Sequence, residues 1–159
     1  MRKKVVAGNW KMNTTPAEGV ELLKGVAALK GDVCSCVNFI VIPPFTHLSE
    51  IVKNAKGTGI AVGAQNCAAE AKGAYTGEIS TDMLTDAGAE YVIIGHSERR
   101  SIEETDFSVH LKTAAALKAG LTPIICVGES QQQRELGTAF EIIATQVKTA
   151  ISTLAKTQV

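Results

Sequence analysis

The chain has 159 residues, of which 45% are apolar and 20% are charged. This composition can bury the core of one ordinary domain, and it excludes intrinsic disorder and a collagen-like fibre. Sixteen basic side chains balance sixteen acidic ones, so no net charge would attract nucleic acid or an acidic membrane surface. No apolar stretch approaches the roughly 18 residues that a membrane helix needs, so we expect no membrane partner.

Four cysteines stand at positions 34, 36, 67 and 126, and their spacing fits neither a zinc knuckle nor a CxxC redox pair. We interpret them as buried, reduced thiols of a cytoplasmic protein. The three histidines at 47, 96 and 110 are too scattered to show metal-ligand spacing. We therefore expect no metal site.

Short apolar runs recur along the chain. They cover residues 5–8, 37–42, 60–64, 91–95 and 122–127. These runs are mostly apolar rather than alternating, which is typical of strands that a parallel sheet buries on both faces beneath helices.

Helix signals lie between the runs. Thr15, Pro16 and Glu18 combine an N-cap, a first-turn proline and a capping-box glutamate. Ser80 can cap a short helix, and Gly120 can close a later one. Two predicted helices each have an apolar face, formed by Val20, Leu23, Val26 and Ala27 in the first and by Leu48, Ile51, Val52 and Ala55 in the second. The helix after Ser80 carries Met83, Leu84 and Ala87, and a fourth helix is marked by Phe107, Leu111, Ala114 and Ala115.

The last quarter of the chain also reads as helical. A short helix is predicted to begin at Ser130 and to stop near Gly137. Thr138 and Glu141 form a further capping box. One long final helix is predicted by the helical spacing of the apolar residues that follow, which are Phe140, Ile143, Val147, Ile151 and Leu154.

Five βα units in succession, without a linker, indicate one α/β domain over residues 1–159. Two architectures fit this pattern. One is a doubly wound, flavodoxin-like sheet of about 150 residues, and length alone favours it. The other is the first five units of an eight-unit barrel of about 250 residues.

In either architecture, functional residues follow strand ends at the carboxyl edge of the sheet. Asn9 and Lys11 follow the first strand, without the glycine pattern of a dinucleotide site or a phosphate loop. A lysine on a loop facing the site suits an anionic substrate. A solvated surface lysine fits this position equally well.

The fourth strand is followed by the densest cluster of ionisable groups, His96, Glu98, Arg99 and Arg100. A histidine at the carboxyl edge can polarise a carbonyl or shuttle a proton. The adjacent Glu98 and Arg99 favour this function over a structural histidine. The residues alone thus indicate an α/β protein whose site unites Lys11 and His96 around a small anionic substrate.

Three other features carry weaker signals. His47 and His110 lack ionisable neighbours, and we interpret both as structural or solvated. Glu129, after the fifth strand, could be catalytic, but a role in orienting a loop or a helix is favoured. The loop over residues 65–80 exceeds the usual length of roughly two to six residues, which predicts a functional or interfacial segment.

Six motifs, in this order and at these strand ends, closely resemble the triosephosphate isomerase family. They are GNWKMN at 8–13, PPF at 43–45, GAQN at 63–66, GAYTGEIS at 73–80, IGHSERR at 94–100 and CVGE at 126–129. The resemblance runs the whole length of the chain. It implies the (β/α)₈ TIM barrel, of which residues 1–159 would be the first five βα units.

The resemblance also implies a reaction, the interconversion of dihydroxyacetone phosphate and D-glyceraldehyde 3-phosphate by proton transfer through an enediolate, without a cofactor. By the family pattern, His96 is the catalytic electrophile. Lys11 is catalytic and substrate-binding, and supplies positive charge to the phosphate and the developing oxyanion. Asn9 binds and positions the substrate. Glu98 would hold Lys11, while Cys126 and Glu129 would support the site.

The family resemblance implies a homodimer built through the loop 65–80, with Thr76 at its tip. Gln65, Glu78 and Arg99 are then candidate interface contacts. One departure from the family lies at 101–104, where Ser-Ile-Glu-Glu is one residue short. It leaves the start of the fourth long helix undefined.

A larger departure concerns the family's general base, a glutamate in a Glu-Pro-Val-Trp-like motif after the sixth strand. Residues 1–159 contain no match to it, nor to the mobile lid and the later phosphate loops. We therefore expect the 159-residue chain alone to have little or no isomerase activity. The alternative is a stand-alone half-barrel without catalysis, which would self-assemble by pairing its two exposed edge strands.

Overall fold

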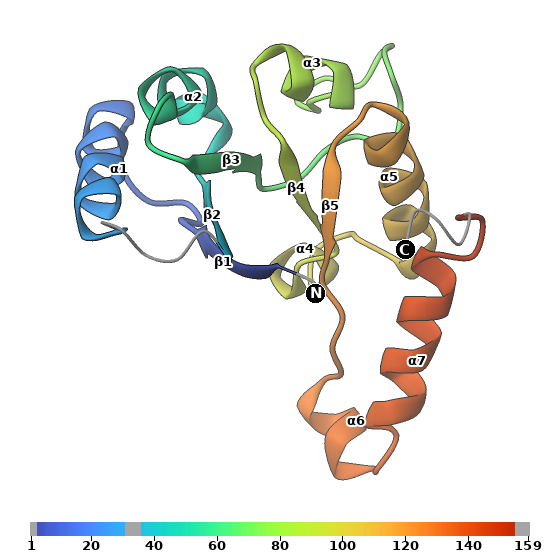
Figure 1. The fold of residues 1–159 in the computed structure, drawn as a ribbon. Helices are drawn as coiled ribbons and strands as arrows, with labels where there is room; N and C mark the ends of the chain where they lie inside the picture. Colours follow the sequence, from blue (N-terminus) through green and yellow to red (C-terminus); the bar gives the residue numbers. More distant parts are fainter. Residues whose placement is uncertain (1–2, 31–35, 155–159) are drawn as a thin grey trace.

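The computed structural model describes residues 3–30 and 36–154, and a single curled sheet of five parallel strands forms its centre (Figure 1). The strands are β1 (Lys4–Asn9), β2 (Val37–Ile42), β3 (Ile60–Ala64), β4 (Tyr91–Ile94) and β5 (Thr122–Ile125). They neighbour one another in chain order, whereas a doubly wound sheet reverses its order at a switch point. The sheet is therefore a section of a barrel wall, and the expected barrel architecture is confirmed.

Helices alternate with the strands. They are α1 (Pro16–Lys30), α2 (Leu48–Ala55), α3 (Thr81–Asp86), α4 (Ser97–Arg100), α5 (Asp106–Lys118), α6 (Gln131–Glu135) and α7 (Ala139–Ala150), with a 3₁₀ turn over Phe45–His47. The long helices lie around the outside of the curled sheet, and α7 runs alongside α5 (Figure 1). The short α4 directly follows β4 at the carboxyl edge.

Alternate side chains of the central strands enter two different cores. Val41 and Val92 belong to the large cluster beneath the helices. Ile40, Ile42 and Ile93 form a second buried cluster on the opposite, inner face. Burying each such side chain stabilises the folded state by about 1.5–3 kcal/mol relative to leaving it exposed. This two-sided burial explains why the strands read as continuous apolar runs.

The two edge strands are less protected. Val5 and Val6 of β1 are 52% and 56% exposed, while Ile42 of β2 is fully buried. β5 is at most partly buried at every position. Among the described residues neither edge has a second neighbour, so the outer side of each lacks strand pairing.

Most of the predicted helix ends are present. The Ser80 hydroxyl accepts the Met83 N–H, and Ser130 and Gln133 form a complete capping box. Gly120 closes α5 with a positive φ of 82°, and the following N–H of Leu121 donates to Ala116. At α1 the Glu18 carboxylate accepts both the backbone N–H and the hydroxyl of Thr15, at 2.7 and 2.9 Å.

The capping box predicted at Thr138 is wrong. No side-chain cap bond forms there, because the Thr138 hydroxyl instead donates to the carbonyl of Gln133 at 3.1 Å. The final helix is also shorter than predicted, since α7 ends at Ala150. Its buried residues are Gln146 and Ala150, while Phe140 is 90% exposed.

The apolar residues that mark α5 in the sequence do not form its buried face. Phe107 is 66% and Leu111 40% exposed. The side of α5 that packs inward carries Val109, Lys112, Thr113 and Ala116. A buried lysine lies in this row because it has a buried carboxylate partner, described below. The helix itself begins at Asp106 with a Thr105 cap, which defines the start that the sequence left open.

Burial of the cysteines is confirmed in part. Cys67 is buried, and burial raises the pKa of its thiol to about 11. Cys126 is half-buried, and burial raises its pKa too. The prediction is wrong for Cys36, which is exposed, and Cys34 lies outside the described residues. None of the described helices has the length and apolarity needed to cross a membrane.

Candidate active site

The fold brings the two predicted site segments together. Asn9 is the last residue of β1, and Lys11 follows two positions later. His96 follows β4 and caps α4. Because parallel strands end at the same edge of a sheet, these residues from distant parts of the chain meet there.

The backbone at Lys11 is held on both sides. Its N–H donates to Asn9 Oδ1 at 3.0 Å, and its carbonyl accepts from Gln65 Nε2 at 2.8 Å. The φ angle of Lys11 is 54°, in the left-handed region that few residues other than glycine adopt. Gln65, predicted as an interface contact, thus bonds within its own chain, where it also donates to the carbonyl of Ile42.

Lys11 and Glu98 form an ion pair across the site. Lys11 Nζ lies 2.7 Å from Glu98 Oε1, and both side chains are more than half exposed. The hydrogen bond from Lys11 lowers the pKa of Glu98, and the positive charge of Lys11 adds to the effect. The predicted pairing is confirmed, and it directs the lysine toward the segment that carries His96.

The His96 ring is oriented by its own helix. Its Nδ1 accepts the backbone N–H of Glu98 at an N···N distance of 3.2 Å. A backbone N–H always carries its hydrogen, so Nδ1 acts as acceptor and the proton of the neutral ring resides on Nε2. The longer 3.4 Å contact between Nδ1 and Glu98 Oε2 is the weaker of the two. An Nε2–H donor can polarise a carbonyl oxygen.

A small hollow of about 150 Å³ separates the two segments. It is lined by Asn9, Lys11, Met12, Gln65, His96, Glu98 and Arg99. The Nε atom of Arg99 is buried and has no hydrogen-bond partner among the described residues. A larger hollow of about 480 Å³ lies between α3 and α5. The smaller hollow is the candidate site because it unites an amide, a lysine and a histidine.

Two further predictions concern residues outside this hollow. The structural interpretation of Glu129 fits its close ion pair with Arg134, whose hydrogen bond helps to lower the Glu129 pKa after the main contribution of its own backbone N–H. His47 is buried and bonds to the Thr14 carbonyl and the Thr46 hydroxyl. His110 contacts the carbonyl of Ala150. Neither histidine lines the hollow, which fits their interpretation as structural or solvated residues.

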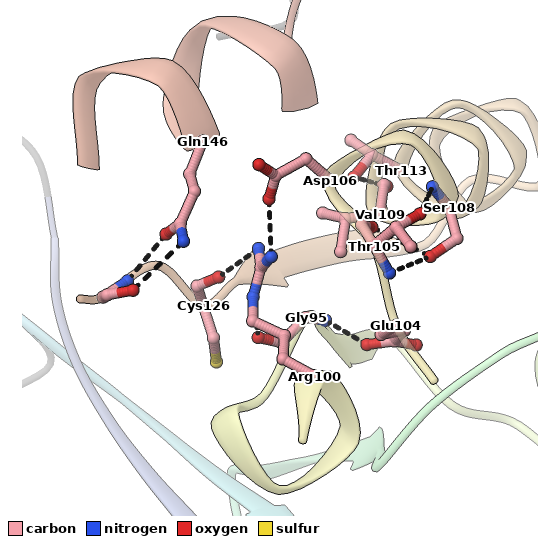
Figure 2. A network of polar contacts seen from close by, with 11 residues as sticks. Gly95, Arg100, Glu104, Thr105, Asp106, Ser108, Val109, Thr113, Cys126 and Gln146 are labelled. Carbon is pink, nitrogen blue, oxygen red and sulfur yellow. Dashed lines mark hydrogen bonds and ion pairs between the residues drawn. The ribbon is translucent and has the colours of Figure 1, made fainter. Parts of the chain in front are cut away.

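A polar network around Gly95, the residue before His96 in the chain, has no counterpart in the sequence prediction (Figure 2). Arg100 reaches Gly95, Asp106 and Cys126, and Glu104 reaches Gly95. The available signal was Lys112, a charged residue at helical spacing from the buried Val109 and Ala116. Hydrophobic periodicity passes over such a residue, because it counts only apolar side chains.

The site as described offers no metal centre. Within residues 3–30 and 36–154, no group of three or more histidine, cysteine, aspartate or glutamate residues is placed to hold a metal ion.

Comparison with known proteins adds a consistent finding. The family model of triosephosphate isomerase matches residues 4–159. A triosephosphate isomerase from Endomicrobium trichonymphae is 52% identical over 157 residues, which are 97% of this chain and 62% of that protein. Another, from Porphyromonas gingivalis strain ATCC 33277, is 52% identical over 159 residues, with 99% of this chain and 63% of that protein covered.

Solved structures agree. The crystal structure of triosephosphate isomerase from Bartonella henselae superposes with a TM-score of 0.89 at 38% sequence identity. The alignment covers 98% of this chain and 64% of that chain. The chain thus spans a little over three fifths of the length of each protein that it resembles.

Proposed function

The chain belongs to the triosephosphate isomerase family, and on that premise we propose that it supplies Asn9, Lys11 and His96 to the interconversion of dihydroxyacetone phosphate and D-glyceraldehyde 3-phosphate in the cytoplasm. The observation that carries the proposal is the meeting of Lys11 and His96 around one hollow. The substrate is an anion whose carbonyl must be polarised. Lys11 provides a cationic side chain for it, and His96 provides a hydrogen-bond donor at Nε2.

Each residue has a defined part in the proton transfer. His96 donates from Nε2 to the carbonyl oxygen, whose negative charge grows as the adjacent carbon loses its proton. Lys11 stabilises the same charge and attracts the phosphate. Asn9 already uses its Oδ1 to hold the Lys11 N–H, so its amide NH₂ is the group left to donate to the substrate.

The base that removes the carbon-bound proton is a separate matter. Glu98 faces the site but pairs with Lys11, and Glu129 pairs with Arg134. A carboxylate with a lowered pKa is a weak base. The hydrogen bond from Lys11 lowers the pKa of Glu98, and the bond from its own backbone N–H, followed by that from Arg134, lowers the pKa of Glu129. We propose that neither glutamate replaces the family's base, and that residues 1–159 by themselves turn over little or no substrate.

A chimera tests these roles. Residues 1–159 are joined to the part of the Porphyromonas gingivalis relative that the alignment leaves uncovered, and the purified chimera is assayed in both directions. Turnover by the chimera should fall by about 10²-fold or more when His96→Gln removes the electrophile. Lys11→Met should also lower it strongly. An active chimera that tolerates His96→Gln, or robust turnover by the 159-residue chain alone, would contradict the proposal.

We also propose that the whole protein is a homodimer through the loop 65–80. Residues 70–78 of this loop are exposed, including the apolar ring of Tyr75. The buried Nε of Arg99 has no partner among the described residues, and such a donor is costly unless another group accepts from it. A monomer by analytical ultracentrifugation at micromolar concentration would contradict this.

A second candidate, the self-assembling half-barrel, draws on a different observation. The exposed valines of β1 lie on a strand with one unpaired side, and such edges pair readily with other chains. A defined oligomer of the 159-residue chain that is lost on Val6→Lys would favour this candidate.

A further inference from the structure

Gly95, the residue before His96, occupies a place that only glycine fits. Its φ is +75°. A Cβ on this residue would lie 2.9 Å from Arg100 Nη2, 2.9 Å from Val109 Cγ2 and 3.1 Å from the carbonyl oxygen of Cys126. The chain is thus turned sharply, in a closely packed space, directly before the histidine.

Both polar backbone groups of Gly95 are bound by charged side chains. Its N–H donates to Glu104 Oε2 at 2.9 Å, and its carbonyl accepts from Arg100 Nε at 2.7 Å (Figure 2). That carbonyl belongs to the planar peptide unit that ends at the Cα of His96. Fixing the carbonyl therefore fixes one end of the His96 backbone.

The arginine is anchored at its other nitrogens. Nη1 donates to Asp106 Oδ1 at 2.6 Å, and Nη2 donates to the Cys126 carbonyl at 3.1 Å. Arg100 thus joins the end of β4, the end of β5 and the start of α5 through one rigid guanidinium. A planar fork of donors holds such a geometry better than a lysine can.

The glutamate is anchored equally well. Glu104 forms a close ion pair with Lys112 of α5, and their side chains are only 3% and 10% exposed. Lys112 Nζ also donates to Asn66 Oδ1 at 3.0 Å, in the segment after β3. Hydrogen bonds to charged groups are stronger where water is excluded.

We propose that Arg100 and Glu104 are positioning residues for His96: they grip the two polar groups of the Gly95 backbone and so set where the imidazole points. This inference rests on the proposed function, in which His96 is the electrophile. Neither residue touches the hollow between Lys11 and His96, so both act through Gly95 rather than on a substrate.

The ring nitrogens of His96 provide a direct readout. The chain contains three histidines, so a ¹⁵N spectrum of the imidazoles is simple, and His96→Gln assigns the relevant signals. In the unaltered 159-residue chain, Nε2 of His96 should carry the proton and Nδ1 should accept. Arg100→Gln should abolish this single tautomer and give a mixture, with the ring signals shifted. Arg100→Lys should restore it in part, because one donor can again reach the Gly95 carbonyl.

His47 is the internal control, because among the described residues its ring bonds only to Thr14 and Thr46. Unchanged His96 signals in Arg100→Gln, with the fold intact, would overturn the proposal. If that variant does not fold, Arg100→Lys and Asp106→Asn decide: a shift at His96 alone supports the proposal, and no shift in either overturns it. Because the spectra do not depend on turnover, an inactive chimera would remove the proposed function without altering this result.

Discussion

The backbones of Gly95 and Lys11 are both held by side chains that bind their N–H and carbonyl groups, but these side chains are charged at Gly95 and neutral at Lys11. At Gly95 the N–H and the carbonyl are bound by Glu104 and Arg100, and each of these is itself ion-paired. At Lys11 the corresponding groups are bound by the neutral amides of Asn9 and Gln65, at an exposed position.

The difference teaches how rigidity is distributed in the site. Buried charges interact strongly only while every partner is in place, so the segment before His96 is costly to disturb. At an exposed position water competes with the amides of Asn9 and Gln65 for the backbone groups of Lys11, so these hydrogen bonds hold the Lys11 segment more weakly. The directional donor is thus fixed firmly, whereas the lysine, whose charge acts over a longer range, needs less precise placement.

The largest effect should come from leaving the buried carboxylate of Glu104, which binds the Gly95 N–H, without its cation. Lys112→Met removes the partner of Glu104, and we expect a loss of about 3–5 kcal/mol in the free energy of unfolding. Urea denaturation followed by circular dichroism measures it. Lys118→Met, an exposed lysine on the same helix, is the control and should change little. Equal losses in the two variants would show that the buried pair is not special.

Crowding at Gly95 gives the next largest effect. Gly95→Ala and Gly120→Ala both place a side chain at positive φ, at +75° and +82°, but only the first meets atoms within 4 Å. The strain is shared, so the difference isolates overpacking, and Gly95→Ala should cost about 1–3 kcal/mol more. The same denaturation experiment compares them. Indistinguishable costs would mean that the space around Gly95 yields easily.

Removing a hydrogen bond from the backbone of Lys11 should lower the free energy of unfolding less than either change near Gly95. Gln65→Leu removes the donor to the carbonyls of Lys11 and Ile42, and we expect a loss of about 1 kcal/mol. Gln132→Leu on the exposed surface of α6 is the matched control. A loss as large as that from Lys112→Met would erase the contrast between the two grips.

The smallest effect concerns the exposed pair of Lys11 and Glu98. The pKa of Glu98 is lowered from its ordinary 4.5 by the bond from Lys11. The stabilisation it brings is therefore complete above the ordinary pKa and is lost as the pH falls through the lowered one. A carbon-detected NMR titration should find the Glu98 pKa below 4.5, and Lys11→Met should return it upward. If the pKa of Glu98 were the same in Lys11→Met, the bond from Lys11 would not be what lowers it.

The sequence predicts those elements whose signals lie within a short stretch of neighbouring residues. The strands 37–42 and 60–64 are confirmed as predicted, because each is a mostly apolar run of the length and composition of a buried strand. Asn9, Lys11 and His96 were placed at the sheet edge because parallel strands end together. Their roles in catalysis stay a proposal.

The misses have a common physical cause. Lys112 lies on the buried face of α5 because Glu104 neutralises it, and Thr138 fails as a cap because the carbonyl of Gln133 takes its hydroxyl. Glu104 and the Gln133 carbonyl both lie outside the helix concerned, so a prediction made from the sequence of that helix alone does not include them. Arg100 was seen as part of a charged cluster, yet its three contacts join β4, β5 and α5, and only the tertiary structure brings these together.

Amide hydrogen exchange, resolved by residue in the 159-residue chain, tests the contrast most directly. The Gly95 N–H, bound to a buried carboxylate, should exchange at least about tenfold more slowly than the Lys11 N–H, bound to an exposed amide, after correction for intrinsic rates. That result would place the firm grip next to His96. Equal protection, or faster exchange at Gly95, would contradict the claim that buried charge fixes the histidine segment.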